Sequence, residues 1–452
     1  LFQSAYAGGW TRDEPEKPAV LVHELRFGAE TEWLPPQVLG AIPADPGPTD
    51  QTRLVASINE ASRQADIPLP RPPWQPELKR IVDLFALGPR DDRALIIGTG
   101  DQPEEQLQET VHFFPDSDGN LAIYGTGGSG KTVLLRTLAA AAGVTPRGGP
   151  VDVYGLDFAA GGLRMLEFLP HVGAVIPGDD HERVVRLLRM LKRELEARTR
   201  RYASLDVGSV ADYREKSAQA LEPRILLLLD GFPAFRAEYE TTSGRAPWYA
   251  TFQQLLSEGR ALGIHVVFTA DRPGSVPGAV ASSVPRRVVM RLAEETMYTL
   301  LDVESDVLTA ASPPGRAIVD GLEVQVAIFG GSANVADQSA ALASLATAIT
   351  CAVRAEAPKV GALPTELPAR DLPESVAGLP VLGIGDEDLA PVGLQPQGVL
   401  LVGGPPGSGR SNALLVLVDA VERAMPMTRL FYLGSRRSAM ATRGGWEEAA
   451  LT

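Results

Sequence analysis

The chain of 452 residues has little cysteine and no long apolar run. Its single cysteine, Cys351, excludes an internal disulfide and a cysteine-based zinc site, which fits a reducing compartment. No run of about 18 apolar residues is present to cross a membrane as a helix, and no signal peptide opens the chain. The five histidines are scattered and lack the spacing of metal ligands.

Positive charge is also scarce, because the formal net charge is −14. This net negative charge argues against an extended surface that binds nucleic acid, although it does not exclude a local basic patch. With 44% apolar and 22% charged residues, the composition is that of a globular protein. The length exceeds one ordinary hydrophobic core, so two or three domains are expected.

A phosphate-loop pattern stands near the middle of the chain. Residues 121–124 are apolar or aromatic, the sequence G-x-x-x-x-G-K-T runs from Gly125 to Thr132, and an apolar helix is predicted to end near Gly143. A strand, a glycine loop and a helix in this order cradle phosphates with backbone amides and the helix N-terminus. The alternative is a glycine-rich turn without a ligand. The predicted ATP-binding residues are Gly125, Thr126, Gly127, Gly128, Ser129, Gly130, Lys131, Thr132 and Val133.

Apolar strands alternate with helices after this loop. Strands are predicted at 151–156, 225–230, 265–269 and 287–292, with helices at 182–202 and 248–262 between them. Strands buried on both faces and separated by helices indicate a mostly parallel sheet flanked by helices. The predicted fold class is therefore α/β, with a mostly parallel sheet that is flanked by helices and carries a P-loop nucleotide site. Ligands of such sheets sit beyond the carboxyl ends of the strands, where we expect Lys131, Thr132, Asp157, Asp230 and Thr269.

Two of these positions suggest roles in nucleotide chemistry. Asp230 ends an apolar strand, and with the Thr132 hydroxyl it is predicted to hold Mg²⁺; the alternative for Asp230 is a strand-end cap. Thr269 is either a sensor of the γ-phosphate or a polar residue with a purely structural role. After Asp230, where an active ATPase of this kind usually has a glutamate base, the chain has Gly231. Losing a general base costs roughly 10²–10⁴ in rate. We therefore expect tight binding of ATP and Mg²⁺ with slow hydrolysis, unless a neighbouring subunit supplies the base.

An arginine finger offered to a neighbouring subunit has three candidates in the sequence, Arg260, Arg272 and Arg316. A second basic feature is the helix predicted at 182–202, whose polar face carries Arg189, Lys192, Arg193, Arg200 and Arg201. This face is read as solvated beside acidic neighbours, with a nucleic-acid groove as the alternative.

Internal repeats divide the chain. Residues 1–9 nearly copy residues 323–331, so they are predicted to be the last strand of a preceding, similar module. A second pattern of strand, loop and helix begins with an apolar strand predicted at 399–402, and its loop has an arginine where the first loop has lysine. Arginine is bulkier and fork-shaped, so this loop is read as degenerate. Its residues are Gly404, Gly407, Ser408, Gly409, Arg410 and Ser411.

The predicted boundaries follow from these repeats. They are 1–9 for the end of a preceding module, 10–331 for the ATPase domain with the intact loop, 332–380 for a helix and proline-rich linker, and 381–452 for a partial, degenerate third domain.

Five sequence motifs together resemble the FtsK/SpoIIIE superfamily, and more narrowly the second ATPase domain of the EccC-like type VII secretion ATPases. They span 125–132, 156–163, 229–232, 258–267 and 314–317. The resemblance implies a P-loop NTPase fold of RecA/FtsK type in tandem modules. It also implies three tandem ATPase domains behind a membrane anchor that this chain is expected to lack. It also implies a cytoplasmic location at the inner face of the membrane, assembly into hexamers, and recognition of small helical secreted proteins through a C-terminal signal peptide. ATP and Mg²⁺ would be the cofactors, and no nucleic-acid partner is expected.

Two other functions remain open on the sequence. The first is a DNA-translocating motor of the same superfamily, which the acidic net charge, Gly231 and the tandem modules disfavour. The second is a structural scaffold in which bound ATP only stabilises the fold.

Overall fold

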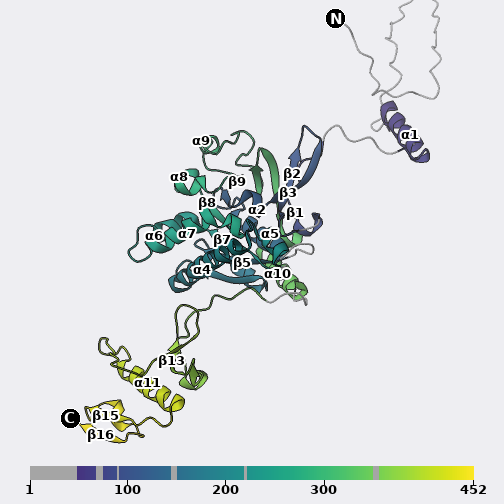
Figure 1. Ribbon diagram of the computed structural model, residues 1–452. Coiled ribbons are helices and arrows are strands. Elements are labelled where there is room, and N and C mark those ends of the chain that lie inside the picture. Colours follow the sequence, from purple (N-terminus) through teal and green to yellow (C-terminus); the bar gives the residue numbers. More distant parts are fainter. Residues whose placement is uncertain (1–47, 68–74, 89–90, 144–149, 218–220, 350–355) are drawn as a thin grey trace, which may run out of the picture. The chain divides into compact units, whose positions relative to one another are not determined.

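A computed structural model describes residues 48–67, 75–88, 91–143, 150–217, 221–349 and 356–452 (Figure 1). The chain divides into two compact units, residues 1–74 and 75–452. In the first unit the described element is helix α1 (Asp50–Gln64), which begins where the Thr49 side chain accepts a hydrogen bond from the Thr52 amide. The strand predicted at 1–9 lies outside the described residues.

The second unit is built on one large sheet, of eleven strands among the described residues. Its strand order is β3-β2-β11-β10-β9-β4-β8-β7-β5-β6, with β1 paired to β11. The run from β9 to β6 is parallel, whereas β10, β11, β2 and β3 pair antiparallel. The bounds are β1 (Val82–Asp83), β2 (Leu95–Gln102), β3 (Leu107–Phe113), β4 (Leu121–Tyr124), β5 (Val151–Asp157), β6 (Val172–Pro177), β7 (Arg224–Asp230), β8 (Ile264–Ala270), β9 (Arg286–Met290), β10 (Arg316–Val319) and β11 (Leu322–Ile328).

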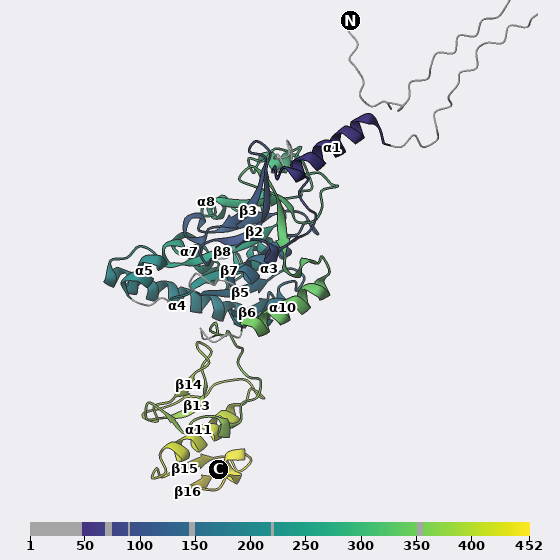
Figure 2. The same ribbon diagram turned by 90° about the vertical axis from the view of Figure 1, so that its right-hand side faces the viewer.

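Helices cover both faces of this sheet (Figures 1 and 2). One apolar core contains α3 and α10, and the other contains α4, α6, α7 and α8. The bounds are α2 (Pro115–Asp118), α3 (Lys131–Gly143), α4 (His181–Leu205), α5 (Val210–Lys216), α6 (Phe232–Tyr239), α7 (Ala246–Glu258), α8 (Gly278–Ser282), α9 (Thr296–Thr299) and α10 (Val335–Ile349). The mostly parallel sheet with helices on both faces confirms the predicted fold class.

The sequence of the central strands explains the two layers. In β7, Leu226 and Leu228 face the core with α3, whereas Ile225, Leu227 and Leu229 face the core with α4 and α7. Side chains alternate across a strand, so a continuous apolar run gives two buried faces. Burying a leucine side chain contributes about 1.5–3 kcal/mol, and each central strand does this on both sides of the sheet.

The segment after α10 lies along the central domain. The Tyr154 hydroxyl donates to the Pro358 carbonyl at 3.1 Å, and Arg183 Nε donates to the Val360 carbonyl at 3.0 Å. Farther along the chain, Asp386 pairs with Arg186 at 2.7 Å and with Arg189 at 3.3 Å. Glu387 pairs with Arg193. Arg189 and Arg193 of the basic face of α4 therefore lie beside acidic side chains, as predicted for that face.

The last 80 residues form smaller elements. They are β12 (Ser375–Val376), β13 (Leu379–Ile384), β14 (Pro391–Gly393), α11 (Arg410–Ala424), β15 (Phe431–Gly434), α12 (Ala439–Thr442) and β16 (Glu448–Leu451). Strands β12–β14 form an antiparallel sheet, and β15 pairs parallel with β16.

The prediction of a strand at 399–402 is wrong. Residues 399–402 are not in a strand, and the side chains of Val399 and Leu401 are 99% and 90% exposed. A strand of this kind needs parallel neighbours to pair its backbone. Among the described residues no strand pairs with this segment.

Candidate nucleotide site

The loop between β4 and α3 has the backbone of a phosphate cradle. Gly128 and Gly130 have φ angles of +72° and +113°, which L side chains rarely adopt. A Cβ at Gly130 would lie 2.8 Å from the Gly315 amide nitrogen, and that amide donates to the Ser129 carbonyl at 2.7 Å. At Gly127 and Gly128 a Cβ would meet nothing within 4 Å. Residue 315 therefore holds the loop on one side, through its contact at Gly130 and its hydrogen bond to Ser129. The loop is open at Gly127 and Gly128, where phosphates would bind.

Lys131 begins α3 and turns its ammonium back over the loop. Its Nζ donates to the Gly125 carbonyl at 2.5 Å and to the Thr126 carbonyl at 2.9 Å. Burial lowers the pKa of Lys131, while the charges of Asp230 and Asp271 act in the opposite direction. A cation held by neutral carbonyls at a helix N-terminus gains most from an anionic ligand.

The Mg²⁺ ligands predicted from sequence come together at the end of β7. The Thr132 hydroxyl donates to Asp230 Oδ2 at 2.6 Å, and the Thr269 hydroxyl donates to Asp230 Oδ1 at 2.6 Å. Asp230 is 2% exposed. Hydroxyl and carboxylate oxygens are the donors that Mg²⁺ prefers, directly or through water, so the residues fit this ion. Thr269 also accepts a hydrogen bond from the Gly231 amide at 2.8 Å.

Gly231 occupies a position that has no room for a side chain. Its φ is +89°, and a Cβ would lie 2.9 Å from the Phe158 carbonyl oxygen. The close approach follows from the register, because β5 and β7 are neighbours with Asp157 opposite Asp230. The sequence shows only that a glutamate is missing, whereas the fold leaves none of the space that its Cβ would need.

Asp157, predicted at the same edge, serves the backbone. Its carboxylate accepts from the amides of Ala159 at 3.1 Å, Gly161 at 3.2 Å and Leu163 at 2.9 Å. These bonds shape the turn after β5, and they leave Asp157 outside the residues that line the cavity. Its contribution to the site is to hold residues 158 and 159 against Gly231.

An open cavity of about 640 Å³ joins these groups. It includes Lys131, Thr132, Asp230 and Thr269, and also residues that the sequence did not single out as ligands: Arg136, Asp271, Pro314 and Val335. Asp271 directly follows β8, and a carboxylate two residues beyond Thr269 was the available signal. Arg136 is one turn beyond Thr132 in α3, a spacing that places both on one helix face.

Arg136 links the cavity to α10. Its Nε donates to the Gly162 carbonyl at 2.7 Å, and its guanidinium donates to Gln338 at 3.2 Å. Burial lowers the pKa of Arg136, and the charges of Asp230 and Asp157 raise it. The guanidinium is thus a fixed positive group beside the phosphate loop.

The three candidate finger arginines lie in different settings. Arg316 Nε donates to Gln325 at 3.0 Å, and its guanidinium also contacts Glu323 and the Leu78 carbonyl. The Arg316 guanidinium is therefore bound within its own domain, which leaves it poorly placed to reach a neighbouring subunit. Arg260 and Arg272 are exposed, and Arg272 follows Asp271 at the cavity.

The degenerate loop keeps part of the same geometry. A Cβ at Gly404 would lie 2.4 Å from Ser408 Oγ, as one at Gly125 would lie 2.5 Å from Ser129 Oγ. Gly407 and Gly409 have φ angles of +80° and +87°. Arg410 and Ser411 are exposed, however, and no carboxylate in the described residues bonds to Ser411 as Asp230 does to Thr132.

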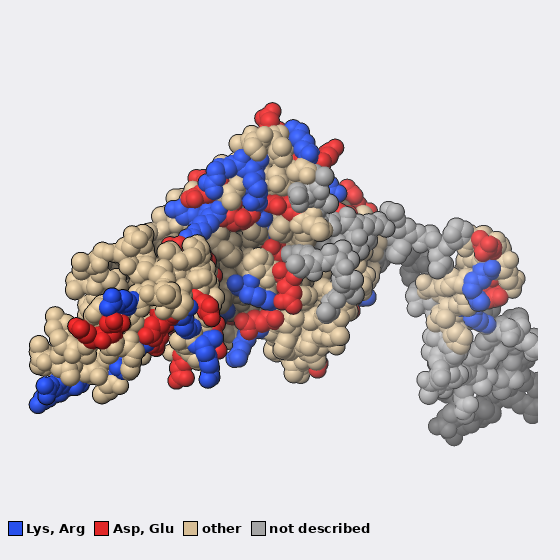
Figure 3. Space-filling model, turned by 60° about the horizontal axis from the view of Figure 1, so that its bottom comes forward, with Lys and Arg blue, Asp and Glu red and all other residues tan. Residues whose placement is uncertain are grey.

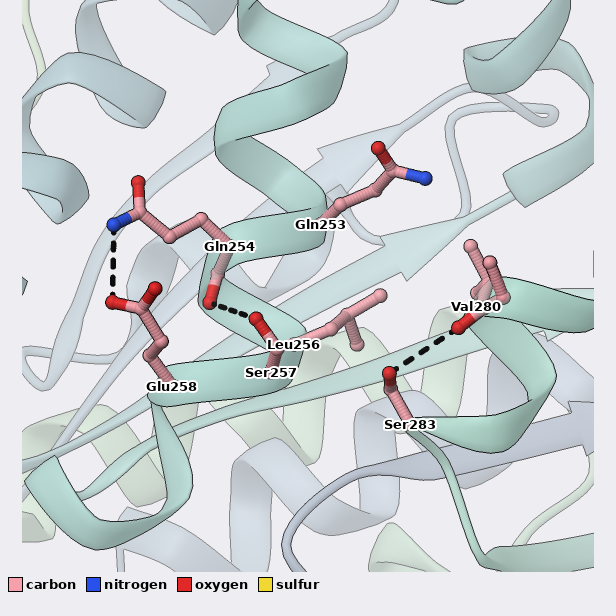
Figure 4. A pocket seen from close by; sticks show the side chains of 8 residues that line it. Gln253, Gln254, Leu256, Ser257, Glu258, Val280 and Ser283 are labelled. Carbon is pink, nitrogen blue, oxygen red and sulfur yellow. Dashed lines mark hydrogen bonds between the residues drawn. The ribbon is translucent and has the colours of Figure 1, made fainter.

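A second, smaller hollow of about 280 Å³ lies between the end of α7 and α8 (Figure 4). Gln254 donates to Glu258 at 3.0 Å along one wall, and Val280 and Ser283 form the other. Asn120, directly before β4, donates to the Leu256 and Ser283 carbonyls and so links the two walls. The hollow is therefore at the opposite end of β4 from the phosphate loop.

Comparison with known proteins agrees with this geometry. Residues 92–313 match the model of the FtsK/SpoIIIE family. The ESX-1 secretion system protein EccCb1 of Mycolicibacterium smegmatis (strain MKD8) is 28% identical over 399 residues, which cover 81% of this chain and 65% of that protein. EccC of Thermomonospora curvata is 26% identical over 481 residues, covering 97% of this chain and 36% of the relative. The chain therefore spans less than two thirds of the length of these relatives.

Solved structures give the same fold. EssC from Geobacillus thermodenitrificans (ATPases 2 and 3) superposes with a TM-score of 0.68 at 20% identity, covering 84% of this chain and 73% of that one. Thermomonospora curvata EccC (ATPases 2 and 3), in complex with a signal sequence peptide, gives a TM-score of 0.65 at 23% identity with the same coverage.

The sheet order and the phosphate loop define a P-loop NTPase. Residues 92–313 form an FtsK/SpoIIIE family domain. The chain as a whole is similar to the EccC-like ATPases of type VII secretion systems. In the part of the chain that the structure describes, no helix is both long and apolar enough to cross a membrane.

Proposed function

We propose that the central domain binds ATP and Mg²⁺ tightly, hydrolyses ATP slowly, and uses the bound nucleotide to hold a secretion ATPase in its working form. The observation that carries this proposal is that Lys131, Thr132 and Asp230 line one cavity together with Gly231. Lys131, Thr132 and Asp230 supply the binding groups, whereas a glutamate base at residue 231 would collide with the Phe158 carbonyl. ATP and Mg²⁺ would neutralise the Lys131 ammonium and coordinate the paired oxygens of Thr132 and Asp230.

The partners that we propose are small helical secreted proteins, recognised through a C-terminal signal peptide. Support comes from the type VII secretion relatives and from the EccC structure solved with a signal sequence peptide. We further propose that the chain works beside other ATPase domains in a hexamer at the inner face of the cell membrane.

Surface charge favours a peptide over a nucleic acid. Four arginines of α4 are paired: Arg186 and Arg189 with Asp386, Arg193 with Glu387, and Arg201 with Glu222. On the face shown in Figure 3, acidic side chains lie beside the basic ones. Binding to DNA would first have to break these ion pairs.

Nucleotide retention tests the central claim. Purified wild-type protein should carry ATP close to one per chain, with steady-state turnover near background. Lys131→Ala should lose the nucleotide, because the phosphates lose their buried cation. Arg410→Ala, the matched change in the degenerate loop, should keep it. Turnover of several per second, or ATP retained by Lys131→Ala, would contradict the proposal.

Partner class is tested separately by titration at two salt concentrations. Duplex DNA contacts would weaken by roughly 0.9 log units per log unit of salt for each phosphate neutralised. We expect no DNA-stimulated hydrolysis, and binding of a substrate C-terminal peptide that changes little with salt. Salt-sensitive micromolar DNA binding with stimulated hydrolysis would favour a DNA translocase instead.

A further inference from the structure

We propose that Asp271 is the catalytic carboxylate of the central site, taking the part that Gly231 cannot fill. The inference rests on the proposed ATP binding and adds the group that activates water. Asp271 is one of two carboxylates that line the nucleotide cavity, counted over the residues that the structure describes. The other is Asp230.

Asp230 is committed to other contacts. One of its oxygens accepts from Thr132 and the other from Thr269, each at 2.6 Å. A carboxylate that holds these hydroxyls at the Mg²⁺ position is poorly placed to receive a proton from water. Gly231 cannot be the base, because the Phe158 carbonyl lies where a Cβ would be.

The Asp271 carboxylate lines the nucleotide cavity and is not held by other side chains among the described residues. It directly follows β8 (Ile264–Ala270), the strand between β4 with the phosphate loop and β7 with Asp230. Its side chain is exposed in the cavity, and within the described ranges it has no hydrogen-bond or ion-pair partner. It is also close enough to Lys131 to stabilise the charged ammonium. Because that ammonium is the group that reaches the β- and γ-phosphates in such loops, Asp271 would lie near the reacting end of bound ATP.

The step that follows balances without another reactant. A water oxygen bonds to the γ-phosphorus while the bond from that phosphorus to the β–γ bridging oxygen breaks. The bridging oxygen leaves with its electron pair as part of ADP, and the water proton passes to the Asp271 carboxylate and then to solvent. An exposed carboxylate that no neighbouring group in the described part of the chain holds in place is a weaker arrangement than a fixed glutamate, which agrees with slow turnover.

The test compares wild type with Asp271→Asn, which keeps the shape and removes the charge. Asp306→Asn is the matched control, because Asp306 is exposed and lies outside the cavity. One measurement is the single-turnover rate of hydrolysis at saturating ATP and Mg²⁺, with Lys131→Ala as the baseline. The other is the affinity for a non-hydrolysable ATP analogue and for ADP, which does not depend on turnover.

We expect Asp271→Asn to lower the single-turnover rate by about 10²-fold or to the Lys131→Ala baseline. We also expect it to tighten binding of the ATP analogue by about fivefold while leaving ADP unchanged, because a carboxylate near the γ-phosphate would repel its charge. Asp306→Asn should change neither quantity.

An unchanged rate, or equal effects on the ATP analogue and ADP, would overturn the assignment of Asp271. So would a wild-type rate no higher than that of Lys131→Ala. In each case retained ATP would leave the proposed function standing, whereas absence of ATP binding would remove both.

Discussion

Replacing Gly231 with alanine should destabilise the central domain even though the change adds one methyl group. Two costs add at this position. A φ of +89° costs an L residue roughly 1–2 kcal/mol. The Cβ would also lie 2.9 Å from the Phe158 carbonyl oxygen, so the ends of β5 and β7 must move. Forcing extra atoms into a packed site costs about 1–3 kcal/mol, and the expected loss is therefore about 2–5 kcal/mol.

Two control glycines separate these costs. Gly321 has a φ of +81° with nothing near its Cβ, so Gly321→Ala should lose only the backbone part, roughly 1–2 kcal/mol. Gly278 has neither constraint, so Gly278→Ala should leave stability unchanged or raise it by about 0.4–1 kcal/mol. Urea unfolding of nucleotide-free protein measures all three free energies of unfolding.

The refuting result is a Gly231→Ala protein no less stable than Gly321→Ala. It would mean that the Phe158 peptide yields easily and that a side chain fits at residue 231. The same reasoning predicts that Gly231→Glu destabilises the domain without raising the hydrolysis rate. A faster Gly231→Glu enzyme would show that only the residue type, and not the space, limits turnover.

Three further predictions concern other parts of the chain. Burial lowers the pKa of His171 and His265 to about 4, so below pH 6.5 the unfolded chain binds more protons than the folded one and stability falls as the pH drops. Each histidine should lower the free energy of unfolding by about 2 kcal/mol between pH 7 and 5. His265→Gln should reduce that loss, measured by urea titration at the two pH values. Asp92→Asn removes one of the two carboxylates that pair with buried Arg224, and Asp116 keeps the other ion pair. The free energy of unfolding should fall by about 1–3 kcal/mol, and a drop under about 1 kcal/mol in the same titration would contradict this account. Arg410→Lys should not bring bound nucleotide to two per chain, measured by chromatography of the released nucleotide, because Ser411 has no carboxylate partner in the described residues.

Local sequence patterns determined much of the fold and part of the site. The apolar run at 225–229 predicted β7, and the glycine pattern at 125–132 predicted the phosphate loop between β4 and α3. These features depend on neighbours in sequence, namely side-chain alternation and glycine backbone freedom. Strand ends of a parallel sheet share one edge, so the meeting of Thr132, Asp230 and Thr269 also followed from the pattern.

The same local logic failed at residues 399–402. Their apolar pattern is that of a buried strand, but a strand needs partners, and those are set by the rest of the sheet rather than by the segment. The loop at Gly404 could be predicted from sequence because glycine conformations are local. Whether neighbouring strands would pair with residues 399–402 could not be predicted in this way.

Sequence alone thus determined that this chain carries a phosphate loop, an aspartate at a strand end and no glutamate at residue 231. Only the tertiary structure decided what surrounds them. The register of β5 against β7 brings the Phe158 carbonyl onto Gly231, and the position of β8 brings Asp271 into the cavity with Lys131. Such contacts join residues more than 70 positions apart, and they depend on strand order, which no local pattern encodes.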